Sequence, residues 1–397
     1  MSEWKKVRLG EIANYVNEKI DIKAFDTSLY ISTDSMLKDK GGIGTPESIP
    51  ESGKVTKYQH NDILVSNIRP YFKKIWFSNR EGGCSNDVLV FRANDNIDST
   101  FLYYVLSDDS FFDHMMSSAN GTKMPRGNRK LIPSFEIPLP PLSTQHRIAT
   151  ILSRYDSLIE NYQKQIKLLE EAAQRLYKEW FVDLRFPGHE NTKIVDGVPE
   201  GWTPSQLGQL AEFKRGKTIT KKNVIDGDIP VVAGGLEPAY YCNKSNTVER
   251  VITISGSGAN AGFTRMYFEK VWASDCSFVD VSVTPFLHFV YCYLKDNKTT
   301  IDNMQKGAAQ PHVYAKDINS MELCIPIESV IKSFERTASK YFDTISSLQS
   351  QLRLLTEARD RLLPKLMSGE LTLEARAEKE DLLATPFKRG WEEDEAK

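Results

Sequence analysis

The sequence predicts an α+β protein with two tandem α+β domains separated by two long antiparallel coiled-coil helices, related by an internal pseudo-twofold repeat. Three observations lead to this fold class. A heptad pattern of apolar residues occurs twice. Two globular blocks of about 130 to 140 residues, a common domain size, flank the first copy. The two blocks also begin and run alike, which indicates duplication of one domain-plus-helix unit.

The first heptad pattern follows Ile148, with apolar residues at alternating steps of four and three. Its positions are Leu152, Tyr155, Ile159, Tyr162, Ile166, Leu169, Ala173, Leu176 and Trp180. The second copy lies 186 residues further on, at Phe334, Ala338, Tyr341, Ile345, Leu348, Leu352, Leu355, Arg359, Leu362 and Leu366. Only Arg359 departs from the apolar pattern, and we expect it to face the edge of the helix pair or a partner subunit.

A repeat of 3.5 residues sustained over five heptads is typical of a coiled coil, because it keeps one stripe facing a partner. The alternative is that each copy is an ordinary core helix of a larger domain. Two long copies in matching register favour pairing with each other. The first helix leaves the first block and the second helix leaves the second block, so we expect the pair to be antiparallel.

Matching residues also relate the two globular blocks. Trp4 and Trp202 open them, 198 residues apart. β-branched runs at 62–66 and 250–255 both end at serine and predict central strands, with an offset of 189. The offset becomes 186 near the end, where Pro125 matches Pro311. A drifting offset indicates insertions and deletions in loops between retained elements.

Local signals predict the remaining elements. Helices are expected at 101–116 and 286–295. The prolines of 138–142 disfavour helix, so the first long helix should follow them, with Ser143 or Thr144 as its N-cap. Pro364 should kink or end the second long helix, and Gly369 should stop it. The predicted boundaries are 1–142 for the first domain, 143–182 for the first long helix, 183–200 for a linker, 201–327 for the second domain, 328–368 for the second long helix, and 369–397 for an acidic mobile tail.

Composition limits the classes of function. The formal net charge is −2, so a nucleic-acid binder of this kind would concentrate its cations in local patches or use a partner's charge. The sequence contains neither an apolar N-terminal segment that would indicate export nor a run of 18 apolar residues that would indicate a membrane span. A cytoplasmic location is therefore expected. Five cysteines without CxxC spacing are interpreted as buried free thiols in preference to disulfides or a zinc site.

The sequence shows no catalytic constellation. The glycine-rich run 256–262 follows a predicted strand, but it fits neither GxGxxG nor GxxxxGK[ST]. A loop that approaches DNA or another loop closely is preferred to a nucleotide site. The histidines lack metalloprotease spacing, and no metal site is predicted.

Loops with basic and amide side chains recur at corresponding places in both blocks. Lysine and arginine neutralise phosphates, while arginine, asparagine and glutamine also make bidentate contacts with base edges. One such cluster alone is often a solvated surface, and the recurrence favours DNA contact. The candidate DNA-binding residues are Asn67, Arg69, Lys73, Lys74, Lys123, Arg126, Asn128 and Arg129 in the first block, and Lys214, Arg215, Lys217, Lys221, Lys306, Gln310 and His312 in the second.

Short motifs distributed along the chain carry a family resemblance. They are Trp4–Gly10 (WKKVRLG), Asp62–Val65 (DILV), Leu139–Gln145 (LPPLSTQ) followed by Ile148, Trp180–Gly188 (WFVDLRFPG), Val198–Trp202 (VPEGW) and Leu362–Glu370 (LLPKLMSGE). In this order the chain, from residue 1 to about 373, resembles the specificity subunit of Type I restriction-modification enzymes.

The resemblance implies two target recognition domains, each reading one half of a split double-stranded DNA sequence, joined by two conserved helices. It also implies a non-catalytic subunit that positions two modification (methyltransferase) subunits and the restriction (endonuclease and translocase) subunits. S-adenosylmethionine, ATP and Mg²⁺ would then belong to those partners, and this chain would hold no cofactor. The alternative is a non-catalytic coiled-coil adaptor that binds proteins without DNA sequence specificity.

Overall fold

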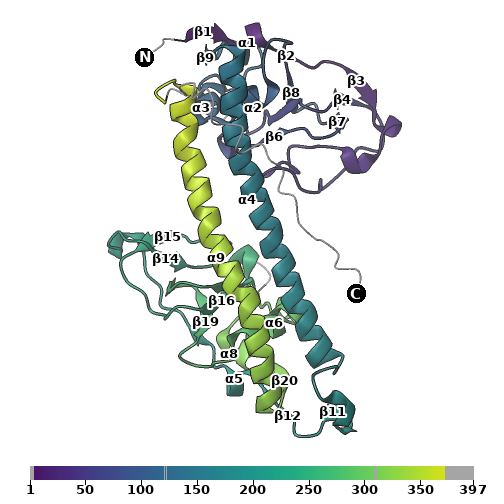
Figure 1. Cartoon of the computed structure of the whole chain (residues 1–397), viewed down its shortest axis with the longest axis vertical. Helices are drawn as coiled ribbons and strands as arrows, with labels where there is room; N and C mark the ends of the chain where they lie inside the picture. Colours follow the sequence, from purple (N-terminus) through teal and green to yellow (C-terminus); the bar gives the residue numbers. More distant parts are fainter. Residues whose placement is uncertain (1–3, 120, 122, 308–310, 372–397) are drawn as a thin grey trace, which may run out of the picture. The chain divides into compact units, whose positions relative to one another are not determined.

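The structure is a computed structural model that describes residues 4–119, 121, 123–307 and 311–371. The chain forms two compact units. The first comprises Met1–Ile159 with Leu354–Lys397, and the second comprises Glu160–Arg353. Each unit therefore contains one globular domain and one part of each long helix (Figure 1). The part of the predicted acidic tail beyond Leu371 lies outside the described residues.

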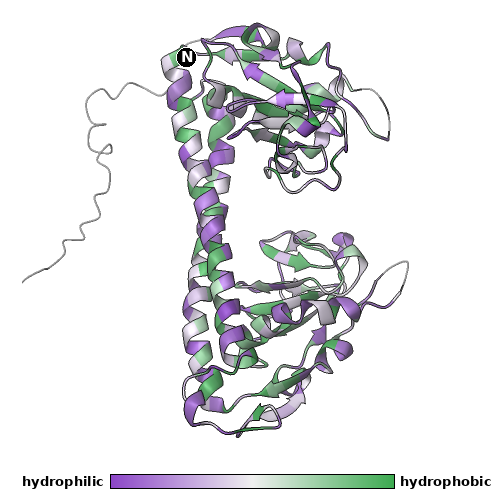
Figure 2. Ribbon diagram, turned by 90° about the vertical axis from the view of Figure 1, so that its right-hand side faces the viewer, coloured by the Kyte–Doolittle hydropathy of each residue, from purple (hydrophilic) through white to green (hydrophobic). Residues whose placement is uncertain are grey.

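Two helices, α4 (Leu142–Tyr177) and α9 (Glu328–Met367), are each continuous across the boundary between the units. In the first unit, Leu152 of α4 shares a core with Leu363 and Leu366 of α9. In the second unit, Ala173 of α4 shares a core with Phe334 of α9. The beginning of each helix thus pairs with the end of the other, and the predicted antiparallel arrangement is confirmed. Figure 2 shows hydrophilic and hydrophobic residues alternating along both helices.

The ends of the long helices differ slightly from the expectation. Helix α4 begins at Leu142, so Ser143 and Thr144 lie in its first turn and are not the N-cap. The amide of Thr144 donates to the Pro141 carbonyl oxygen at 2.9 Å. Proline has a fixed φ that suits the start of a helix, which explains the earlier beginning. At the other end, α9 continues three residues past Pro364, and Gly369 follows with a φ of +73°.

Arg359 points to the other helix of the pair. Its Nη1 donates to Asp156 Oδ1 of α4 at 2.8 Å, and the Tyr104 hydroxyl donates to Asp156 Oδ2 at 2.5 Å. The Arg359 and Asp156 side chains are 25% and 32% exposed. The expectation that Arg359 faces the edge of the pair or a partner subunit is therefore wrong, because a carboxylate on α4 balances its charge within the helix contact.

The first domain is built on a four-stranded antiparallel sheet of order β2-β8-β5-β6. It also contains a three-stranded sheet of order β3-β4-β7, whose strands alternate along the chain with those of the larger sheet, and a short β1·β9 pair. The strands are β1 (Lys5–Arg8), β2 (Ala13–Tyr15), β3 (Lys19–Asp21), β4 (Lys54–Tyr58), β5 (Ile63–Ser66), β6 (Ile75–Phe77), β7 (Gly82–Cys84), β8 (Val88–Ala93) and β9 (Glu136–Leu139). The helices are α1 (Leu9–Ile12), α2 (Ser99–Ser107) and α3 (Asp109–Ser117). The predicted central strand is β5. The single predicted helix 101–116 is instead two helices, because Asp108 adopts an extended backbone and its carboxylate caps α3 through the Ser110 amide.

The second domain repeats this plan. Its four-stranded sheet has the order β13-β19-β16-β17, and β12 pairs with β20 in the register of β1 with β9. The strands are β12 (Thr203–Gln206), β13 (Lys214–Arg215), β14 (Ile229–Val232), β15 (Tyr240–Cys242), β16 (Val251–Ser255), β17 (Thr264–Tyr267), β18 (Trp272–Ala273), β19 (Cys276–Asp280) and β20 (Glu322–Ile325). The helices are α5 (Leu207–Leu210), α6 (Leu287–Asp296), α7 (Lys298–Asn303) and α8 (Ala315–Asn319). The strand predicted at 250–255 and the helix predicted at 286–295 are β16 and α6.

The small sheets of the two domains differ. In the first domain β4 runs antiparallel to β7, whereas in the second β14 runs parallel to β18. The segment predicted as a linker carries a hairpin of β10 (Ile194–Val195) and β11 (Val198–Pro199), and Phe186 packs with Trp202 and Val330 in the second unit. All five cysteines are free thiols, as predicted, and Cys324 is half-buried while the other four are buried.

Candidate nucleic-acid interface

Three loops of the first domain converge beyond the end of β5. They are residues 67–74 after β5, residues 85–87 between β7 and β8, and residues 123–130 after α3. The Arg69 amide donates to the Pro125 carbonyl at 2.8 Å, the Gly127 amide donates to the Asn67 carbonyl at 3.2 Å, and the Asn67 amide donates to the Asp87 carbonyl at 2.8 Å. These main-chain bonds define the first loop junction.

Three loops of the second domain converge beyond the end of β16 in the same way. The Gly258 amide donates to the Pro311 carbonyl at 3.0 Å, the Val313 amide donates to the Gly256 carbonyl at 3.1 Å, and the Gly256 amide donates to the Asp275 carbonyl at 3.1 Å. These bonds define the second loop junction. It joins residues 256–260, 273–275, 305–307 and 311–314.

The two junctions match bond for bond at two places. The bond from Arg69 to Pro125 in the first domain corresponds to the bond from Gly258 to Pro311 in the second, where the donor is offset by 189 residues and the acceptor by 186. The bond from Gly127 to Asn67 corresponds to the bond from Val313 to Gly256, with the two offsets exchanged between donor and acceptor. An isolated β-bridge between Ile68 and Arg126 likewise recurs between Ser257 and His312. Loops that the sequence offsets had paired therefore share one backbone frame.

The first loop junction gathers the predicted residues of its domain, and several of them are already paired. The Arg126 Nη2 atom lies 3.2 Å from Asp87 Oδ2, and the Arg129 guanidinium donates to the Asn86 carbonyl. The Lys73 ammonium lies 2.7 Å from Asp109 Oδ2, and this hydrogen bond raises the pKa of Lys73. Lys74 donates to the Thr33 carbonyl at 2.6 Å. These contacts hold the cations close to the protein surface.

Burial separates the other candidates of the first domain. Asn67 is buried in the junction, and Arg69 and Asn128 are half-buried. Lys123 is exposed and forms no ion pair with any described residue. Desolvation lowers the pKa of Lys74, whose ammonium lies near other cations of this surface. The predicted residues thus include a solvated lysine, Lys123, and several side chains in fixed positions.

The second loop junction gathers fewer of the predicted residues. Arg215 Nη2 lies 3.6 Å from Asp275 Oδ1, and Lys306 Nζ lies 3.0 Å from Asp317 Oδ1. The His312 ring stacks at 6.0 Å from the ring of Tyr314. Lys214 is exposed on β13, and the Lys217 amide donates to the Ala273 carbonyl at 2.9 Å, which places it beside the junction.

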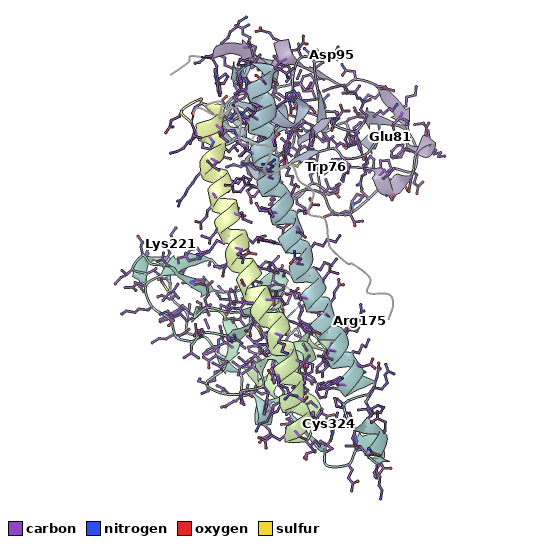
Figure 3. The ribbon with its side chains drawn as sticks, in the orientation of Figure 1. Trp76, Glu81, Asp95, Arg175, Lys221 and Cys324 are labelled. Carbon is purple, nitrogen blue, oxygen red and sulfur yellow. The ribbon has the colours of Figure 1, made fainter. Side chains whose placement is uncertain are left out.

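Two candidates of the second domain are not part of this arrangement. Lys221 belongs to the 3₁₀ turn η7 (Lys221–Asn223), at the end of the domain that carries β14 and β15 (Figure 3). Within the part of the chain that the structure describes, Lys221 makes none of the bonds that define the junction. Gln310 lies outside the described residues.

Acidic residues are the part of the site that the sequence prediction left out. Asp87, Asp109, Asp275 and Asp317 each hold a predicted cation. The pKa of Asp109 is lowered by its hydrogen bond from Lys73. A signal for one of them existed in the sequence, because Ser85-Asn86 and Ser274-Asp275 recur at the offset of 189 next to the central strands.

The glycine-rich run 256–262 does not form a nucleotide cradle. The cavity beside it, lined by Gly256, Asp275 and His312 among others, has a volume of about 20 Å³. This is room for about one water molecule. The amides of Gly256 and Gly258 are used by the loop junction, so they cannot also bind a phosphate. Among the described residues, no three His, Cys, Asp or Glu side chains are grouped to hold a metal ion, and no helix is long and apolar enough to span a membrane.

Comparison with known proteins decides the family. The model of the Type I restriction modification DNA specificity domain matches residues 1–171 and again residues 199–353. The chain belongs to this family. It is a specificity subunit of a Type I restriction-modification system, with two recognition domains, and the resemblance seen in its motifs is confirmed.

Individual relatives agree. The specificity subunit of the enzyme MjaIX from Methanocaldococcus jannaschii is 28% identical over 305 residues, covering 70% of this chain and 71% of the relative. The specificity subunit of the enzyme HindI from Haemophilus influenzae is 23% identical over an alignment of 464 residues, covering 94% and 100%. The crystal structure of the S subunit from M. genitalium, 19% identical, has the same fold with a TM-score of 0.61 and covers 92% of this chain and 96% of that one.

Proposed function

We propose that each recognition domain of this specificity subunit reads one half of a bipartite DNA target, and that its loop junction is the reading surface. The observation that carries the proposal is the recurrence of one backbone frame at the ends of β5 and β16 in two tandem matches to the specificity family. Around that frame stand arginine, lysine, asparagine and histidine side chains, which can contact phosphates and base edges.

The specificity subunit would act in a complex with two modification subunits and with restriction subunits. In this proposal adenine methylation with S-adenosylmethionine and ATP-driven translocation and cleavage with Mg²⁺ belong to the partners. The specificity subunit itself is then non-catalytic and acts by positioning. The lack of room for a nucleotide beside Gly256 supports this division, since the best sequence candidate for a nucleotide site is already occupied by main-chain contacts.

The charge of the chain supports dependence on partners. The formal net charge is −2, and several cations of the junctions are paired with carboxylates of the same domain. DNA affinity grows with the number of phosphates that a protein neutralises. We therefore expect the isolated chain to bind DNA weakly and to gain affinity when modification subunits close around the duplex.

The second candidate function is a coiled-coil adaptor that assembles partner proteins without reading DNA. The long pair α4·α9 alone would suit it. Assembly of partner proteins through the helices would not require two polar loop junctions with a common backbone frame, so the specificity function is preferred.

The test is to sequence the methylated sites in cells that carry this chain together with its modification subunits. We expect one bipartite motif with unread base pairs between the halves. Cells that carry the modification subunits with a chain lacking residues 1–142 serve as the control, because they should lose that motif. Methylation without any sequence preference would support the adaptor and contradict the proposal.

A further inference from the structure

The two loop junctions have the same frame and different side chains. Position 126 of the first domain corresponds to position 312 of the second, since each forms the isolated β-bridge with the loop after the central strand. The first position is arginine and the second is histidine. Position 69 corresponds to position 258, where arginine is matched by glycine. Two sites that read different sequences with one scaffold should differ in this manner.

Arg126 is held in a defined place and still has free donors. Its side chain is 53% exposed, and Nη2 lies 3.2 Å from Asp87 Oδ2. The Asp87 carbonyl in turn accepts the Asn67 amide, so the carboxylate is fixed to the junction frame. Among the described residues, the contact with Asp87 is the only ion pair of Arg126. A guanidinium has five N–H donors, and an arginine pre-positioned in this way can still offer two of them to the O6 and N7 atoms of guanine.

Unsatisfied polar atoms mark the same junction. Asn67 Oδ1 and Arg69 Nε are buried and have no hydrogen-bond partner among the described residues. Arg69 also has a φ of +50°, where the matching Gly258 has a φ of +79°. The left-handed conformation is unfavourable for a residue with a side chain, so the first domain keeps an arginine there against a local cost. Unsatisfied buried polar atoms and a left-handed non-glycine residue are both costly, and such costs concentrate at functional sites.

We propose that Arg126 is a specificity-determining residue of the first recognition domain and contacts a guanine in the major groove, with Asp87 as its positioning residue. The inference rests on the proposed function, because it assigns one base contact within the proposed reading surface. In the second domain, the imidazole of His312 cannot present two parallel N–H donors along one edge as a guanidinium does, and its ring stacks against Tyr314. The second half-site is therefore read by different chemistry at the matching position.

The experiment uses the full chain in complex with its modification subunits and compares methylated motifs. Arg126→His, which introduces the residue found at the matching place of the second domain, should relax or change one G·C pair of one half-site. A good bidentate contact discriminates by about 5- to 150-fold between the right and the wrong base pair, so the loss of preference should fall in this range. The other half-site should stay as it was. Arg126→Lys keeps the charge and should still lose the preference, since an ammonium lacks the planar pair of donors.

Two further variants separate positioning and charge from base reading. Asp87→Asn should relax the same base pair as Arg126→His, and Asp87→Glu should restore part of the preference. Lys130→Ala is the matched control, because Lys130 is exposed in the same loop and its loss should lower methylation of all sites equally and weaken the salt dependence.

Each contrary result is distinct. A wild-type complex without a bipartite motif contradicts the proposed function and with it this inference. A wild-type bipartite motif that Arg126→His and Arg126→Lys leave unchanged overturns the inference alone, as does a motif whose halves contain no G·C pair. Variants of Arg126 that act like Lys130→Ala identify a phosphate contact and likewise overturn it. If Asp87→Asn leaves the motif unchanged, Asp87 does not position Arg126.

Discussion

The network of Tyr104, Asp156 and Arg359 should hold the first recognition domain to its helix pair, and Asp156→Ala tests it. Tyr104 is 4% exposed and donates to Asp156, which also accepts from Arg359 across the helix pair. Burial raises the pKa of Tyr104, so the hydroxyl keeps its proton and needs an acceptor. Removing the carboxylate leaves that donor unsatisfied, which costs about 1–3 kcal/mol.

The ion pair adds a smaller contribution to the free energy of unfolding. The Arg359 and Asp156 side chains are 25% and 32% exposed. The cost of breaking their ion pair should therefore lie between that of a surface pair, about 0–1 kcal/mol, and that of a buried pair, about 3–5 kcal/mol. Arg359 also keeps a contact with Asp360 at 2.8 Å. We therefore assign about 1 kcal/mol to the loss of the pair. The total for Asp156→Ala is about 2–4 kcal/mol, which lowers the melting temperature of the first unit by about 5–15 °C.

Two companion variants make the reasoning refutable. Arg359→Leu restores the heptad pattern and keeps the bond from Tyr104 to Asp156, so the melting temperature should change by about 4 °C or less. Glu335→Ala removes the half-buried carboxylate that binds His288 and the Phe289 amide, and it identifies the transition of the second unit in calorimetry of the whole chain. If Asp156→Ala shifts the first transition no more than Arg359→Leu does, the network does not fasten the domain to the helices.

Three further results are expected. Burial raises the pKa of Glu170 despite Lys295 and Arg265 nearby, so the favourable contribution of the protonated side chain is present below pH 4.5 and is lost as pH rises through the raised folded-state pKa. Glu170→Gln should therefore raise the melting temperature at pH 7 and leave it unchanged below about pH 4. Glu171→Gln, a change at an exposed neighbour, should leave the melting temperature unchanged at both pH values. Gly127→Ala would place a Cβ atom 2.9 Å from Asn67 Oδ1, so methylation that depends on the first junction should fall by about tenfold or more, whereas Gly44→Ala, whose Cβ would meet nothing closer than 3.7 Å, should have no effect in the same methylation assay. Replacing residues 1–142 by the same block of a relative should change one half of the methylated motif and leave the other half intact, and a change in both halves would contradict independent reading by the two domains.

Periodicity and duplication made much of the fold predictable. The heptad positions of α4 and α9 and the central strands β5 and β16 follow directly from spacing in the sequence. The break at Asp108 was missed because an aspartate in an apolar stretch also fits the surface of a continuous helix. The partner of Arg359 was not predicted for a related reason, since Asp156 lies 203 residues away and carries no local signal.

The loop junctions show why a sequence finds the right loops more easily than the right atoms. The offsets of 189 and 186 paired the loops correctly, because an insertion moves a whole segment without altering the residues that make main-chain bonds. Which cation is free and which is neutralised depends on carboxylates from a third loop, such as Asp87 beside Arg126, or from a helix, such as Asp109 beside Lys73. Those pairings differ between the two domains although the frame does not.

The duplicated chain keeps constant what holds the reading surface and varies what surrounds it. The four-stranded sheets share one strand order, and the β1·β9 and β12·β20 pairs share one register. The small sheets have opposite relative strand directions at β4·β7 and β14·β18, and both β7 and β18 lead directly into the loop that supplies Asp87 or Asp275. A change in the small sheet can therefore move the carboxylate that orients a reading side chain without disturbing the main-chain bonds of the junction. Divergence of specificity then needs no change in the four-stranded sheet or in the long helices on which the fold depends.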